Sequence, residues 1–232
     1  EDIYRPYKQK KKTRASVAIE KGLQPLADFI LAQDKNADVR AEAEKYVDEE
    51  KGVATADEAI AGAKDIIAEI VSDDANVRKK LRNLFMKNGE IQTKLVIADK
   101  EGAKTYEMYA DYSEPVAEIK SHRVLAVNRG EKEDFLKVKV VFNDEIAKRI
   151  AGAGYLKDGG YSTQLVQEAV EDGYDRLIYP SIEREIRAAL TESASEQAIK
   201  MFEVNLKPLL MQPPIKDKIT LGLDPAYRTG CK

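Results

Sequence analysis

The segment TADEAIAGAKDIIAEIV, residues 55–71, carries the clearest structural signal in the chain. The Thr55 hydroxyl is placed to accept a hydrogen bond from the backbone N–H near Glu58. The Glu58 carboxylate is placed to reach back to the Thr55 N–H, which completes a capping box. This pattern predicts the start of a helix that continues through Val71.

Shorter helices are expected before this segment. Thr13 is a good N-cap, and the apolar residues after it fall near helical spacing. Gly22 and Pro25 predict a break that divides the segment into two short helices. Asn36 is placed to cap another helix, which runs through Val47.

After residue 71 the helical period resumes. A start at Ser72 or Asp73 is followed by apolar residues on one face as far as Val96, with Gly89 as the only weak point. The sequence therefore predicts one amphipathic helix here. Two further helix starts are marked by Ser113 with Pro115 and by Ser121, the second helix running to about Gly130.

The hydrophobic period changes at Phe135. Between Leu136 and Phe142, apolar residues alternate with lysines, which is the spacing of a strand with one solvated face. A single strand cannot satisfy its own backbone groups, so this one needs a partner. A short helix is expected from Asn143 to Ile150. The glycine-rich stretch AGAGYLKDGGYS that follows lacks the lysine and Ser or Thr of a phosphate-binding loop, so we interpret it as a connection between helices.

The C-terminal part is expected to hold the longest helix. A helical pattern covers residues 163–178, and Pro180 with Ser181 opens a second one that keeps its apolar stripe to Leu206. Its roughly 26 residues would span about 40 Å, a length suited to bridging parts of a molecule. Pro208 predicts a kink or an end.

A domain boundary is expected between Met211 and Lys218, because QPPIKDK has the composition of a linker. The apolar run ITLGL, residues 219–223, then predicts a strand. Its only candidate partner in the chain is the strand at 136–142, so we expect the two to pair, or one of them to pair with a neighbouring molecule. The predicted fold class is mainly α: a multi-helix N-terminal region, a long C-terminal helix and one or two short strands.

Composition restricts the classes of function. The chain has 38 basic and 41 acidic residues and a formal net charge of −3, so any attraction to nucleic acid must be local. Its one cysteine, Cys231, excludes an internal disulfide. No apolar stretch approaches the roughly 18 residues of a membrane span, so no membrane partner is expected and a soluble cytoplasmic protein is the default expectation.

A basic run near the N-terminus is the candidate nucleic-acid site. Its cations can contact phosphates, and the interleaved Tyr4 and Tyr7 can stack on bases. The alternative is a solvated connector with no ligand. The candidate residues of the basic run are Arg5, Lys8, Lys10, Lys11, Lys12 and Arg14.

The sole histidine, His122, has no second metal ligand at short spacing, and we interpret it as part of a helix start.

Several long motifs occur in an order that resembles the Tex family of bacterial transcription accessory proteins. They are KTRASVAIEKGLQPLADFI, YVDEEKGVATADEAIAGAKDIIAEIVSDDANVRKKLRNLF, YSEPVAEIKSHRVLAVNRGEKEDFLKV and LGLDPAYRTGCK. The resemblance implies an N-terminal helical domain over residues 1–214. It also implies that residues 215–232 are the first strand and loop of a YqgF domain, which has a ribonuclease H-like fold. The OB-fold that binds RNA in this family is expected outside the chain.

The resemblance places Asp224 at the position of a YqgF carboxylate. Two-metal phosphodiester chemistry needs several convergent carboxylates, and one aspartate cannot build that cage. The usual glycine after the proline is Ala226 here, which reduces conformational freedom at the loop. We therefore interpret Asp224 as a vestigial position and expect no catalytic residue, no metal and no cofactor.

Three functions remain open from the sequence. The favoured one is a scaffold of a Tex-like transcription accessory protein, acting on RNA mainly through domains outside this chain and together with proteins of the transcription complex. The second is a protein-interaction module that docks a partner through its long helix. The third is part of a metal-dependent nuclease or resolvase, for which Asp224 is the only feature.

Overall fold

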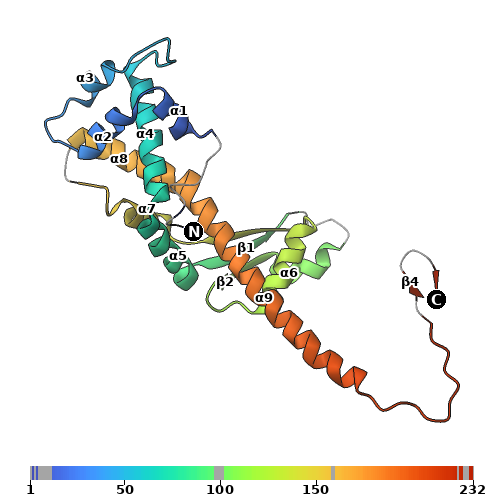
Figure 1. Ribbon diagram of the computed structural model, residues 1–232. Coiled ribbons are helices and arrows are strands. Elements are labelled where there is room, and N and C mark those ends of the chain that lie inside the picture. The colour runs from blue at the N-terminus through green and yellow to red at the C-terminus, as the bar shows by residue number, and fades with distance from the viewer. Residues whose placement is uncertain are drawn as a thin grey trace.

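The computed structural model describes residues 2, 4, 12–96, 102–157 and 160–223, and the backbone of 225–226 and 230–231. As predicted, the fold is mainly α with a long C-terminal helix. In place of the one or two short strands expected, it contains a small three-stranded antiparallel sheet. A helical body lies at one end and the sheet at the middle, and helix α9 (Tyr179–Leu210) runs past the sheet and projects beyond it (Figure 1). Within the described ranges, no helix is both long and apolar enough to cross a membrane.

The helical body begins as the capping residues predict. Thr13 forms a reciprocal capping box with Ser16 and starts α1 (Arg14–Glu20), and α2 (Gln24–Ala32) follows the break. Asp38, rather than Asn36, caps the short helix α3 (Val39–Glu44).

Helix α4 (Ala56–Asp73) is the centre of the body. Thr55 accepts a hydrogen bond from the Glu58 N–H at 3.2 Å, as predicted. The Glu58 carboxylate reaches back to the Ala54 N–H at 2.8 Å, one residue earlier than expected. Helices α1, α2 and α3 all pack against α4.

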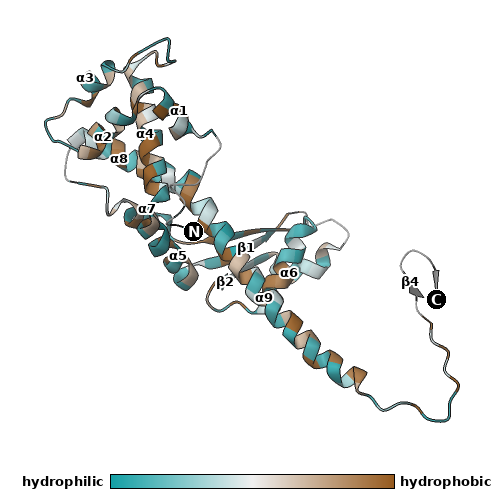
Figure 2. Cartoon of the chain, viewed as in Figure 1, coloured by the Kyte–Doolittle hydropathy of each residue, from teal (hydrophilic) through white to brown (hydrophobic). Residues whose placement is uncertain are grey.

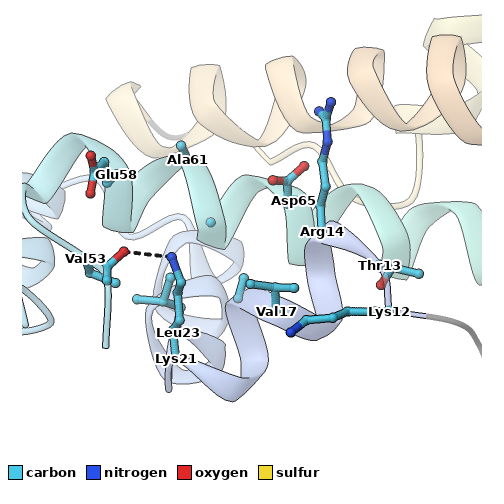
Figure 3. Close-up of a pocket in the computed structure, with 13 residues that line it drawn as sticks. Lys12, Thr13, Arg14, Val17, Lys21, Leu23, Val53, Glu58, Ala61 and Asp65 are labelled. Atoms are coloured by element: carbon cyan, nitrogen blue, oxygen red, sulfur yellow. Dashed lines mark hydrogen bonds between the residues drawn. The ribbon is translucent and has the colours of Figure 1, made fainter. Parts of the chain in front are cut away.

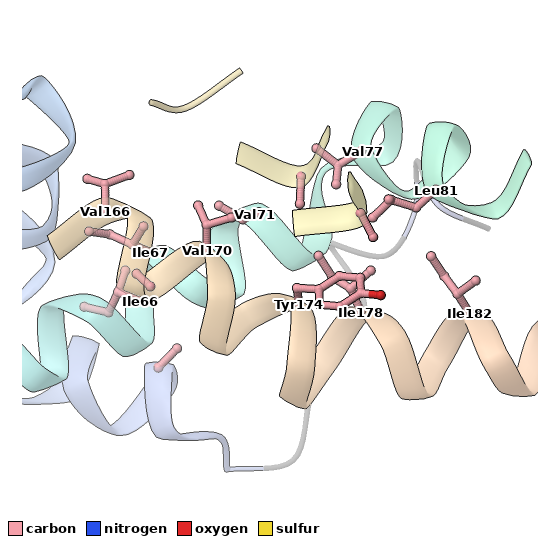
Figure 4. Packing of buried hydrophobic residues seen from close by; sticks show 14 of the residues in the cluster. Ile66, Ile67, Val71, Val77, Leu81, Val166, Val170, Tyr174, Ile178 and Ile182 are labelled. Carbon is pink, nitrogen blue, oxygen red and sulfur yellow. The ribbon is translucent and has the colours of Figure 1, made fainter. Parts of the chain in front are cut away.

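Helix α8 (Gly160–Gly173) packs along α4 and closes the main core. Figure 4 shows the aliphatic side chains of both helices meeting in this layer. Gly173 marks the closest approach, because a Cβ built on it would lie 2.9 Å from the carbonyl oxygen of Ala68. The buried residues in this layer are Ile66, Ile67, Val71, Val166 and Val170.

The break expected before Pro180 is absent. A π-helical turn, Tyr174–Ile178, joins α8 directly to α9, and Pro180 lies in the first turn of α9. Within this continuous helix Pro180 cannot donate to the hydrogen-bond ladder, and this interruption coincides with the π-helical turn immediately before it. Pro208 lies in the last turn, and the helix ends at Leu210.

The predicted helix over residues 72–96 is wrong in its second half. Helix α5 (Ala75–Asn88) ends at Gly89, whose backbone is extended, and β1 (Glu90–Leu95) follows. A Cβ at Gly89 would lie 2.4 Å from the carbonyl oxygen of Phe85, so this bend favours glycine. The apolar residues after Gly89 fit a period of two as well as a helical period. They form a strand because β1 pairs with β2 and β3.

The helix start expected at Ser113 is also wrong. After a short 3₁₀ helix, η2 (Ala103–Tyr109), the chain forms β2 (Asp111–Pro115), which pairs with β1. Helix α6 (Ser121–Lys132) begins where predicted.

The predicted strand at residues 136–142 is confirmed as β3 (Leu136–Val141), but its partner is β1, in the order β2-β1-β3. Helix α7 (Asp144–Gly152) follows, capped by Asn143.

The strand expected at residues 219–223 does not form. These residues are exposed and have no regular structure. Strand β3 pairs with β1 on one side, and the Val140 N–H and carbonyl bond the Glu183 and Tyr179 side chains of α9 instead of a second strand. A two-residue pairing, β4 (Pro225–Ala226) with β5 (Gly230–Cys231), follows. Asp224 lies outside the described residues. The domain boundary near residue 214 remains a prediction.

The contact at Gly173 gives the first testable expectation. Gly173→Val places a branched side chain against the α4 backbone, which cannot move cheaply, so we expect a loss of about 1–3 kcal/mol in the free energy of unfolding. Chemical denaturation measures it. The control is Gly154→Val, because a Cβ at Gly154 meets nothing within 4 Å. Equal stability of the two variants would contradict the tight α4–α8 contact.

Candidate nucleic-acid interface

The basic run is only partly described. Lys12 and Arg14 are exposed at the start of α1. The other four candidate cations, Arg5, Lys8, Lys10 and Lys11, lie outside the described residues. The structure nevertheless describes residues on both sides of this stretch, and each is bound to the folded body.

The first anchor is Asp2. Its carboxylate accepts hydrogen bonds from Arg78 Nε at 3.2 Å and from Arg82 Nη2 at 2.8 Å, both on α5. Glu185 on α9 accepts from Arg82 Nε at 2.8 Å and also binds Arg78, which in turn donates to Ser181 Oγ. Two cations and two carboxylates therefore join the N-terminal segment to α5 and α9.

Burial makes this cluster significant. The Arg78 side chain is fully buried, and its Nη1 has no hydrogen-bond partner among the described residues. Burial tends to raise the pKa of Asp2 and of Glu185, but the arginines outweigh it, so both pKa values are lowered. Both carboxylates are therefore charged at neutral pH and compensate the arginines.

The second anchor is Thr13. Besides capping α1, its hydroxyl donates to Glu69 Oε2 on α4 at 2.9 Å. Described residues on both sides of positions 5–11 are therefore bound to the folded body, and Lys12 and Arg14 flank the second of these anchors.

A groove lies beside the second anchor, between α1, the turn at Gly52 and α4 (Figure 3). Its volume is about 590 Å³, and Lys12, Arg14 and Lys21 line it. The ammonium group of Lys21 donates to the Gly52 carbonyl oxygen at 2.7 Å, which holds that turn against α1.

The groove has mixed charge. Asp65 lies in its wall, and burial raises the pKa of that carboxyl although Arg176 and Arg14 act against the rise. Lys12 pairs with Glu20 at 3.7 Å, but both side chains are largely exposed, so the pair contributes little. Lys12 and Arg14 can therefore turn to a phosphate at low cost.

The remaining candidates do not add to this site. His122 is the second residue of α6 and is exposed. Among the described residues, no group of three His, Cys, Asp or Glu side chains could hold a metal ion. Sequence reasoning missed the Asp2 anchor, because the fold brings Asp2 beside arginines that lie 76 and 80 positions later. One sequence signal could have indicated the anchor: Arg78 falls on the apolar face of α5, and a buried arginine needs an acidic partner.

Comparison with known proteins identifies relatives. A family model described as Tex central region-like matches residues 34–202. Over the whole chain, identity is 51% to protein YdcI of Bacillus subtilis and 35% to Protein tex of Bordetella pertussis, of which the chain covers 32% and 31%. The human S1 RNA-binding domain-containing protein 1 is 29% identical over the whole chain, which covers 24% of it. The chain thus spans about a third or less of the length of these curated relatives.

The Asp2 anchor yields a prediction about stability and pH. Glu185→Gln leaves buried Arg78 without one of its two compensating charges, so we expect a loss of about 1–2 kcal/mol in the free energy of unfolding at neutral pH. Because the pKa of Glu185 is lowered by folding, its contribution is present above the unfolded value and disappears as pH falls through the folded value. The difference from wild type should therefore shrink below about pH 4.

Urea titrations between about pH 4 and neutral pH measure the free energy of unfolding of wild type and of Glu185→Gln. Glu192→Gln is the control, because Glu192 is an exposed residue of the same helix, and we expect it to change stability by less than about 0.5 kcal/mol. A Glu185→Gln effect that is independent of pH would show that the charge of the cluster is not what stabilises it.

Proposed function

The chain belongs to the Tex family, and we propose that it forms the N-terminal scaffold of a transcription accessory protein that binds RNA. The names of relatives support this: one from Neisseria gonorrhoeae is a transcriptional accessory protein Tex, and the human one is named for an S1 RNA-binding domain. Since the chain spans only part of these relatives, we place the strongest RNA contact in the part that it does not cover.

The observation that carries the proposal is the basic run held at Asp2 and Thr13. Six cations fall between residues 5 and 14 in a chain whose net charge is −3, and the neighbouring Asp2 and Thr13 are both bound to the folded body. Lysines and arginines that contact phosphates supply sequence-independent affinity. The groove beside Lys12 and Arg14 extends this surface onto the folded body.

We propose no catalytic turnover for this chain. Its single histidine and single cysteine cannot form a nucleophile and base pair near one another in sequence, and Asp224 is one carboxylate where two-metal chemistry needs several. RNA cleavage that depends on a divalent metal and is lost in Asp224→Asn would favour the nuclease alternative instead.

The RNA proposal is tested with the basic run. Replacing Lys10, Lys11 and Lys12 by Gln should weaken binding of a short single-stranded RNA, measured by fluorescence anisotropy. Each lost phosphate contact lowers the slope of log Kd against log salt by about 0.7, so the slope should fall by about 2.

The matched control removes the same charge elsewhere. Lys200, Lys207 and Lys216 are exposed on distal α9 and the tail, and replacing them by Gln should leave both affinity and slope unchanged. Equal losses in the two variants would show that only net charge matters, and the basic run would then not be a site.

A second function is favoured by distal α9. Beyond Gln197, which accepts a hydrogen bond from Ser121 of α6, the helix projects from the folded body (Figure 2). Six large apolar residues in this projecting part are 61 to 74% exposed. Ile199, Phe202, Leu206 and Leu209 recur at helical spacing along one face. An exposed apolar stripe of this length indicates docking into a hydrophobic groove. We propose that its partner is the part of a Tex protein that this chain does not cover.

This docking is tested in trans with a YdcI fragment that lacks the third matching this chain. Phe202→Asp and Leu209→Asp should each weaken the complex at least about tenfold, because a charge is buried in an apolar contact. Stability of the chain alone should stay within about 0.5 kcal/mol, since both side chains are exposed. Asn205→Asp adds the same charge to the same helix and is the control. Calorimetry measures the affinities, and equal effects of all three variants would refute docking through the stripe.

A further inference from the structure

The three-stranded sheet has two different faces. One face packs against α6 and α9: Ile91 and Val138 meet Val124 and Val127 of α6 and Leu190 of α9 around a small internal cavity. Figure 1 shows α6 and α9 beside the sheet. Because side chains alternate along a strand, the residues between these apolar ones point to the opposite face.

That opposite face carries three exposed lysines, Lys94 on β1 and Lys137 and Lys139 on β3. The register sets Lys94 directly opposite Lys137, and Lys139 lies on the diagonal, opposite Gln92. We call these three residues the lysine face. They lie close together because the sheet pairs β1 with β3, which the sequence did not predict.

This arrangement is unfavourable for the isolated protein. Like charges directly across a strand pair repel and destabilise the sheet. Two carboxylates share this side: Asp111 stands opposite Lys94 on β2, and Glu90 accepts a hydrogen bond from Ser113. Against three lysines the two carboxylates leave an excess of one positive charge, and within the described part of the chain none of the three lysines forms an ion pair.

We propose that the lysine face binds the phosphate backbone of a nucleic acid. The ligand must be polyanionic, because it has to satisfy three neighbouring cations at once. Lys137 and Lys139 are two residues apart on one strand, about 7 Å, which suits successive phosphates of an extended chain. Lysine acts as a point charge, so the contact is independent of sequence.

The neighbours of the lysine face agree with contact to the backbone rather than to bases. Gln92 and Ser113 offer hydrogen-bonding groups between the lysines and the β2 edge. The aromatic residue of β2, Tyr112, points to the other side, where its hydroxyl accepts a hydrogen bond from Arg123 of α6. Among the described residues of the three strands, no ring lies on the lysine face for a base to stack on.

This inference rests on the proposed RNA function and adds a second contact, separate from the basic run. The test uses the full chain and a short single-stranded RNA at about 50 mM salt. The triple variant Lys94→Gln, Lys137→Gln, Lys139→Gln should bind about tenfold or more weakly, with a salt slope lower by about 2. The triple Lys→Arg variant should retain the wild-type affinity because it keeps the charge.

Thermal unfolding provides a readout that does not depend on the ligand. The Gln variant loses both the Lys94–Lys137 repulsion and the Lys94–Asp111 attraction, which oppose one another, so its Tm at low salt should stay close to that of wild type. A lost affinity would then not come from unfolding.

The outcomes separate the two proposals. If wild type binds no RNA, both fail. If the basic-run variant loses affinity but the lysine-face Gln variant binds RNA like wild type, the RNA function stands and the lysine face is not a site. If the Gln variant keeps its RNA affinity but loses binding to polyglutamate, the face serves an acidic protein segment, and the nucleic-acid proposal is wrong.

Discussion

The continuous rod formed by α8, the π-helical turn and α9 is the constraint on which the rest of the structure depends. Its first half packs on α4, and its second half packs on α5, α6 and β3. One side of the turn between them is buried: Tyr174 and Ile178 are almost inaccessible, and the Tyr174 hydroxyl donates a hydrogen bond to Asp144 of α7 at 3.0 Å. An extra residue in a π-helical turn shifts the helical face that follows it. The rod can therefore present one apolar side to the helical body and another to the sheet.

Much of this architecture was predictable from local signals. Thr13, Thr55 and Asn143 start helices where their side chains can cap them, and the alternation after Leu136 gives a strand. The errors share one physical origin. Residues 90–95 and 111–115 are strands because they pair with each other and with β3, and such pairing is absent from local sequence. Residues 219–223 have strand composition but lack a neighbour, so they remain without regular structure.

Of the candidate nucleic-acid site, only the concentration of positive charge could be predicted from the sequence. The density of lysines between residues 5 and 14 is visible in the sequence, whereas its anchoring is not. Asp2 looks like an ordinary N-terminal residue until the fold sets it beside Arg78 and Arg82. The lysine face is a similar case. Lys94 and Lys137 lie 43 positions apart and become neighbours only through strand register. Long-range pairing therefore converts scattered cations into surfaces.

The proposed surfaces differ in chemistry and are carried by one frame. Asp2, three positions before the basic run, is tied to the frame through arginines that also bind Glu185 of α9. The lysine face lies on the sheet that packs against the same helix, and the apolar stripe occupies its projecting end. A single helix of 32 residues spans about 48 Å, so it fixes the separation between phosphate contacts and an apolar docking surface. Such a frame needs no conformational switch to act. In the functions proposed above, its contribution is to hold a nucleic acid and a protein partner at a set distance and orientation.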